Sequence, residues 1–274
     1  MFGKLLKNDL KAQWYSVAPI FLCIFVIAAV SEIFVLVSKN NVVSALGGLL
    51  VSLVLLFACF VIIIAVAMMF SKTVFGRAGY LTLTLPVKTR SLIWSKTLSG
   101  LIWTYTVYIL FFASLFLCIH QVGENMGADF QDMADQIFTL LLGKSISTMI
   151  SMLTYYLIWF AIIMFIIIQC LYLGITCSHV SPVSKLGVLG AVIVFFGAFA
   201  LTVGLTGIVT EVLPFGMVIC EETVTLTSNV VRTQTELGDY AYGFNFAGPL
   251  VMVIISVVLN FPITHLIRNK VNIK

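Results

Sequence analysis

Residues 71–96 read SKTVFGRAGYLTLTLPVKTRSLIWSK, and this stretch decides how the chain has to fold. It carries no acidic residue, and the sequence on either side of it is long, apolar and nearly free of charge. Its five basic residues are Lys72, Arg77, Lys88, Arg90 and Lys96. A basic segment between two apolar runs predicts a loop between two membrane spans, and the excess of Lys and Arg predicts that this loop faces the cytoplasm.

The composition of the whole chain agrees with a membrane protein. The 274 residues are 61% hydrophobic and 9% charged, whereas soluble domains are roughly 25% charged. A transmembrane helix needs about 20 mainly apolar residues. Six windows meet that need, at 17–37, 42–70, 97–119, 145–178, 186–210 and 240–264. Because the runs are continuous and do not alternate, we expect helices rather than barrel strands. The predicted fold is all-α, a single polytopic transmembrane domain over 1–274 with six spans.

The distribution of charge predicts the orientation of these spans. Six spans place both termini on the same side of the membrane. Twelve Lys and Arg residues then lie on that side with one acid, Asp9, and three lie on the other side with ten acids. The positive-inside rule therefore predicts that both termini are cytoplasmic.

The first sixteen residues form a separate element in this interpretation. Apolar side chains recur near helical spacing, with Lys4, Lys7 and Lys11 at the other positions. This pattern predicts an amphipathic helix in the cytoplasmic interface, in contact with membrane lipid. The alternative is a solvated basic segment that leads into the first span.

The region between the last two spans, 211–239, begins with an apolar run that is too short to cross a membrane. Pro214 and Gly216 interrupt this run, so a re-entrant or interfacial piece fits it. The Thr-rich remainder contains β-branched residues and predicts an ordered outer segment.

Three polar residues inside the apolar windows are candidate pathway residues, namely Glu32, Asn245 and Asn260. Polar groups in spans are costly and often functional. The alternatives are an acid that reaches the outer surface for Glu32, and hydrogen bonds between helices for the two asparagines.

Motifs for catalysis are absent from the sequence. There is no HExxH or GxSxG pattern, and the three histidines are far apart, so we expect no catalytic residue and no metal site. Gly143, Lys144 and Ser145 resemble the tail of a P-loop, but position 138 is Phe where a glycine is needed. The spans also lack paired carboxylates that could couple transport to ions. If the protein pumps, its energy comes from another subunit, and nothing indicates a nucleic-acid partner.

The run GYLTLTLPV at 79–87, followed by Lys88, Arg90, Ser91 and Lys96, resembles the loop between the second and third spans of ABC-2 type permeases of bacterial ABC transporters. The likeness extends to the whole plan of the chain: an amphipathic start, six spans, both ends inside and a long outer segment before the last span.

This resemblance implies an exporter of the bacterial cytoplasmic membrane with two permeases and two ATPase subunits. The second permease is another copy of this chain or a homologous one, ATP and Mg are bound by the ATPases, and this chain is not an enzyme. The loop 71–96 then contains a short coupling helix that docks on an ATPase. The residues that the resemblance assigns to coupling are Phe75, Gly76, Arg77, Tyr80, Leu81, Thr82, Pro86, Lys88 and Arg90.

The apolar spans favour a hydrophobic or amphipathic cargo, such as a drug, an antimicrobial peptide or a lipid. Two other classes of function stay open. One is a membrane sensor or assembly subunit that does not pump, and the other is a channel or carrier that works down a gradient. Association with an ATPase subunit would distinguish the exporter from both of these alternatives.

Overall fold

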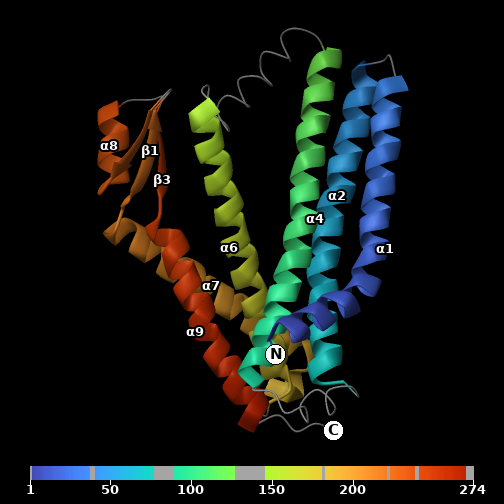
Figure 1. The fold of residues 1–274 in the computed structure, drawn as a ribbon, viewed down its shortest axis with the longest axis vertical. Coiled ribbons are helices and arrows are strands. Elements are labelled where there is room, and N and C mark those ends of the chain that lie inside the picture. The colour runs from blue at the N-terminus through green and yellow to red at the C-terminus, as the bar shows by residue number, and fades with distance from the viewer. Residues whose placement is uncertain are drawn as a thin grey trace. The chain divides into compact units, whose positions relative to one another are not determined.

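The computed structural model describes residues 2–37, 41–76, 89–126, 146–180, 183–220, 223–237 and 241–269. Contacts divide the chain into two compact units, Met1–Phe138 and Thr139–Lys274, whose helices and strands are labelled in Figure 1. The single transmembrane domain expected over the whole chain stays a prediction, and each unit is described by itself.

The described part of unit 1 contains three long helices, α1 (Phe2–Val37), α2 (Asn41–Val74) and α4 (Thr89–Met126). Each of the three packs against the other two. Their sequences are apolar over most of their length, so several faces can be buried against neighbours. The buried core of this bundle consists of Val17, Ile24, Cys59, Ile62 and Val107.

Helix α1 is bent by 53° between its segments Phe2–Tyr15 and Val17–Ile27. Pro19 lies inside the helix just after the bend. A proline has no N–H to donate to the carbonyl four residues earlier, here that of Tyr15, and its ring crowds that carbonyl. The bend therefore falls where the expected amphipathic segment meets the expected first span. The interfacial position of residues 1–16 stays a prediction.

Unit 2 contains the helices α6 (Ile146–Ser178), α7 (Val188–Val212) and α9 (Ala247–Asn269), with a 3₁₀ turn, η1 (Val183–Leu186), before α7. The three helices are in mutual contact. Gly187 joins η1 to α7 with φ 55°, a backbone conformation that glycine adopts without the steric cost of a β-carbon. A buried cluster of Ile166, Cys170 and Met252 ties α6 to α9.

Unit 2 also holds a small antiparallel sheet with strand order β2-β1-β3. The strands are β1 (Gly216–Cys220), β2 (Thr223–Thr227) and β3 (Ala241–Asn245), and Val218 of β1 lies opposite Thr225 and Gly243. A short helix, α8 (Val230–Leu237), packs on β1 and β3. A β-carbon on Gly243 would overlap Val230, so glycine at this position lets α8 lie against the sheet.

The described structure corrects three expectations. The fold is not all-α, and the sixth apolar window does not begin a helix at residue 240, because β3 occupies 241–245 and α9 begins at Ala247. The apolar run before it is also not one re-entrant piece: α7 ends at Val212 and β1 begins at Gly216. Pro214 cannot continue the helix, and the β-branched residues that follow pair with Thr-rich β2. The expectation that this segment is ordered holds for its described part.

Four helices are long and apolar enough to cross a membrane: Leu56–Val74, Thr148–Ser178, Val188–Val212 and Ala247–Arg268. The bent helix α1 makes a fifth if its two segments count as one span. The described part of α4 is outside this set. Only 11% of the α7 window is buried within the protein, as expected for a helix that exposes apolar side chains to lipid. The chain is a multi-pass membrane protein, and its six-span topology is taken up below as a proposal.

Candidate functional site: a polar joint at the start of α4

The predicted coupling residues lie on both sides of a gap in the described structure. Phe75 and Gly76 directly follow α2, and Arg90 is an exposed residue in the first turn of α4. The others, Arg77, Tyr80, Leu81, Thr82, Pro86 and Lys88, fall between 77 and 88, outside the described residues. Figure 1 shows the end of α2 and the start of α4 at the same end of unit 1, so the two helices hold both ends of this segment.

The end of α2 is tightly ordered up to Gly76. The N–H of Phe75 donates to the carbonyl of Ser71 at 2.9 Å, which extends the helical pattern by one residue. The rings of Phe75 and buried Phe70 meet edge to face at 6.1 Å. A β-carbon on Gly76 would overlap the carbonyl oxygen of Lys72. Glycine at position 76 therefore permits the chain to turn away from the helix at this point.

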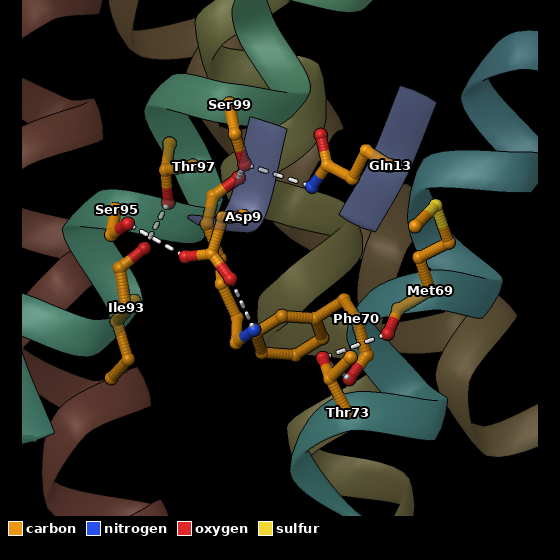
Figure 2. Close-up of polar contacts among 10 residues, drawn as sticks. Asp9, Gln13, Met69, Phe70, Thr73, Ile93, Ser95, Thr97 and Ser99 are labelled. Atoms are coloured by element: carbon orange, nitrogen blue, oxygen red, sulfur yellow. Dashed lines mark hydrogen bonds and ion pairs between the residues drawn. The ribbon is translucent and has the colours of Figure 1, made fainter. Parts of the chain in front are cut away.

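An ion pair fixes the first segment of α1 to the start of α4 (Figure 2). The Lys96 ammonium donates to Asp9 Oδ1 at 3.1 Å, and the Ser95 hydroxyl donates to Asp9 Oδ2 at 2.6 Å. The side chains of Lys96 and Asp9 are only 7% and 16% exposed. Both carboxylate oxygens are thus engaged, and the pair is largely shielded from solvent. A charge in such a setting depends on its partner, because an unpaired buried charge is costly.

A second contact lies one helical turn further along both helices. The Gln13 amide donates from Nε2 to Ser99 Oγ at 2.8 Å, and the Ser99 hydroxyl donates to the carbonyl of Lys96 at 3.0 Å. Asp9 and Gln13 are four residues apart, as are Ser95 and Ser99, so the two contacts repeat with the same spacing. We call the set Asp9, Gln13, Ser95, Lys96 and Ser99 the polar joint.

Aromatic packing continues from the polar joint. The rings of Trp14 and Trp103 lie 5.4 Å apart, and Phe21 packs edge-on to Trp103 at 5.9 Å. The contacts between α1 and α4 therefore run from the charged pair, through an amide contact, to aromatic rings on both sides of the bend in α1. Through this continuous contact, the start of α4 and the first segment of α1 are packed together as one unit.

The polar joint was missed in the sequence. In the sequence, Lys96 belongs to the basic stretch 71–96, and Asp9 stands out only as the one acid on the basic side of the chain. One usable signal was that lone acid, with Gln13 on the same helical face four residues later. A second was the matching Ser95 and Ser99 at the start of an apolar run. The pairing itself joins residues 86 and 87 positions apart, which local patterns do not reveal.

The candidate pathway residues are not brought together by the described structure. The side chain of Glu32 is outside the described residues. Asn245 accepts a bond from the N–H of Ala247 at 2.7 Å and donates to the carbonyl of Thr210 at 3.2 Å. It therefore ties the end of α7 to the start of α9. Asn260 is in the middle of α9 and is 2% exposed. A pathway role for these residues stays a prediction.

Among the described residues there is no group of three or more His, Cys, Asp or Glu side chains that could hold a metal ion. Comparison with known protein families, with curated proteins and with solved structures finds no match. Functional inference therefore depends on the sequence of the loop and on the geometry around it.

Proposed function

We propose that this chain is the permease subunit of a bacterial ABC exporter of the ABC-2 type. The observation that carries the proposal is the phrase GYLTLTLPV at 79–87 with its following bases, in the part of the sequence between α2 and α4. A connector between two helices needs only a few polar residues. This one contains aromatic and leucine residues together with a proline, which suits a surface that docks on another protein.

The polar joint supports a coupling role for this loop. Lys96 is the last base of the quoted stretch, and its ion pair with Asp9 binds the start of α4 to α1. An ATPase that moves the loop would therefore move two helices together. A loop that only rests on lipid head groups would not need a shielded ion pair at its end, because lysines at an interface reach the water on their own.

The proposal includes the finer topology and the partners. The chain crosses the membrane six times, with α1 and α4 among the spans and both termini in the cytoplasm. Two permeases assemble with two ATPase subunits, which bind ATP and Mg. The cargo is hydrophobic or amphipathic, because the described helices α6, α7 and α9 of unit 2 carry no charged residue except Glu211 and Arg268 near helix ends.

The decisive experiment is purification of the tagged full chain from its native membrane in mild detergent. We expect an ATPase subunit with a P-loop to co-purify in equal amount, and we expect the complex to hydrolyse ATP. The Leu81→Asp variant should weaken ATPase binding about 30-fold, since a buried apolar anchor at an interface contributes about 2 kcal/mol. Leu81→Met is the matched control and should bind normally.

Salt dependence separates docking from lipid binding. Arg77→Glu should reduce ATPase binding less than Leu81→Asp does, and its effect should shrink at high salt, as for charges at an interface rim. A loop that binds anionic lipid predicts the opposite ranking. Full ATPase binding and transport by Leu81→Asp would show that the coupling assignment is wrong.

A further inference from the structure

Unit 2 buries three polar side chains inside two of its membrane-spanning helices. Gln169 on α6 and Ser256 on α9 are 0% exposed, and Asn260 on α9 is 2% exposed. These residues lie within the apolar spans Thr148–Ser178 and Ala247–Arg268. Buried polar groups in proteins are nearly always hydrogen-bonded, so the partners of these three side chains decide what they do.

Two of the three are not satisfied. Ser256 donates to the carbonyl of Met252 at 2.8 Å, and Asn260 makes one long bond from Nδ2 to the carbonyl of Ser256 at 3.4 Å. Gln169 Nε2, Gln169 Oε1 and Asn260 Oδ1 have no hydrogen-bond partner in the part of the chain that the structure describes. By contrast, the buried Thr176, Thr202 and Thr206 all donate to carbonyls of their own helices.

The two amides lie at the same level of the helix pair. Trp159 of α6 is 3.6 Å from the place where a β-carbon of Gly248 in α9 would be, and Figure 1 shows the two helices running in the same direction. Gln169 is ten residues beyond Trp159, and Asn260 is twelve beyond Gly248. At roughly 1.5 Å of rise per residue, the two positions are about 15 and 18 Å further along.

They also share one flank of the pair. Successive residues of a helix are separated by about 100°. On α6, Ile166 contacts α9, and Gly174 faces the backbone of Ala191 in α7. At this angular spacing, Gln169 and Gly174 lie on opposite sides of Ile166. On α9, Gly248 faces Thr210 of α7, and Asn260 lies on the opposite side of Met252. Both amides are thus on the flank that points away from α7.

We propose that Gln169 and Asn260 form a binding site for the uncharged amide group of an amphipathic molecule. The unpaired atoms are two acceptors and one donor, which complement the N–H and C=O of an amide. The surrounding spans carry no Asp, Glu, Lys or Arg between 146–178, 188–210 and 247–267, so an ionic head group would be buried without a counter-charge. The apolar helices suit the alkyl part of the ligand. The inference rests on the proposed function as an exporter of amphipathic cargo.

The alternative is that the two amides only hold α6 and α9 together. The two roles predict opposite effects on stability. Leucine replaces glutamine or asparagine with similar volume and no polar atoms. If the amides are unpaired until a ligand binds, Gln169→Leu and Asn260→Leu should raise the Tm of the ligand-free protein, because unsatisfied buried groups are removed. If they bind each other, both substitutions should lower it.

The test uses the full chain in lipid nanodiscs, with N-dodecanoylglycinamide as the probe and N-dodecanoylglycine, its carboxylate counterpart, as the matched control ligand. We expect the amide to raise the Tm of the wild-type protein, and the carboxylate to need about tenfold more for the same shift. Asn260→Leu removes one acceptor and should need about tenfold more amide, and Gln169→Leu removes a donor and an acceptor and should need about a hundredfold more, at about tenfold for each hydrogen bond lost. Thr206→Val, on α7, should respond like the wild type.

Three results would overturn the site: no response of the wild type to the amide, an equal response to the carboxylate, or variants with a lowered Tm and an unchanged response. These readings do not depend on an ATPase. A wild-type protein that binds the probe but recovers no ATPase would contradict the permease assignment and leave the amide site in place. A protein that recovers the ATPase but does not bind the probe would contradict the amide site and leave the permease assignment in place.

Discussion

The two units place polar side chains among apolar helices in different ways. In unit 1 the charged residues of the polar joint satisfy each other: Asp9 receives bonds from Lys96 and Ser95 at 3.1 and 2.6 Å. In unit 2 the amides of Gln169 and Asn260 leave three atoms without a partner among the described residues. Paired groups hold helices in place, whereas unpaired groups cost free energy and persist where another molecule uses them. Unit 1 also leaves Gln13 Oε1 and Trp103 Nε1 without a partner among the described residues, so one unpaired atom does not mark a binding site. Gln169 and Asn260 differ because two amides on neighbouring helices are unpaired together.

The largest test of this comparison is Asp9→Asn. Asparagine keeps the shape but removes the carboxylate charge that faces the shielded Lys96 ammonium, so we expect a loss of about 3 kcal/mol in the free energy of unfolding. The loss can be measured by titration with a denaturing detergent while tryptophan fluorescence is followed. The double variant Asp9→Leu with Lys96→Leu removes both charges and should recover most of it. Losses that simply add in the double variant would show that the pair is not coupled.

Asn245→Ala is the next test, because Asn245 is the neutral counterpart of Asp9 in unit 2. Its side chain binds both the carbonyl of Thr210 and the N–H of Ala247. Removal of both contacts should cost about 2 kcal/mol of unfolding free energy. Asn229→Ala is the control, since Asn229 caps the exposed start of α8 with one bond to the N–H of Arg232 at 3.1 Å and should cost about 1 kcal/mol. An equal loss for the two variants would contradict the structural role of Asn245.

The sequence predicted the helical spans well and the polar partners poorly. The windows 42–70, 145–178 and 186–210 lie within a few residues of α2, α6 and α7, because continuous apolar runs of that length can only be buried helices or spans. The window 240–264 failed at its start. Its first residues, Ala241 to Asn245, are apolar and aromatic, and hydropathy does not distinguish a short strand from the first turn of a helix.

The candidate site shows the same limit. The basic, Pro-containing loop was visible as a local pattern, but Asp9 and Lys96 pair across 87 positions of the chain. The sequence marks Asn260 as a polar residue in a span, whereas Gln169 does not stand out. A single glutamine in an apolar run looks like any tolerated polar residue until the structure shows that its amide is buried without a partner.

Gln169→Leu sharpens the comparison because it is expected to raise the free energy of unfolding, whereas the substitutions above lower it. Without ligand, removal of two unsatisfied buried atoms should raise the free energy of unfolding by about 1 kcal/mol. Gln169→Ala is the control, since it removes the same atoms but leaves a cavity, and it should be less stable than the leucine variant. Both are measured by the same detergent titration. A leucine variant less stable than the wild type would indicate that the amide is already bonded in the free protein.

Gln13→Leu should have the smallest effect, because Gln13 combines both situations in one side chain. Its Nε2 donates to Ser99 Oγ at 2.8 Å, and its buried Oε1 has no partner among the described residues. The leucine variant loses the hydrogen bond to Ser99, which costs about 1 kcal/mol of unfolding free energy. It also removes the unpaired Oε1, which gains about 1 kcal/mol. Ser99 remains satisfied as a donor through its bond to the carbonyl of Lys96. The net change in unfolding free energy should therefore stay within about 0.5 kcal/mol. A loss of about 2 kcal/mol would mean that Oε1 is also bonded, and the polar joint would then be fully paired. A gain of about 1 kcal/mol would mean that the Ser99 contact contributes nothing, and that the Asp9–Lys96 pair alone fixes α1 to α4.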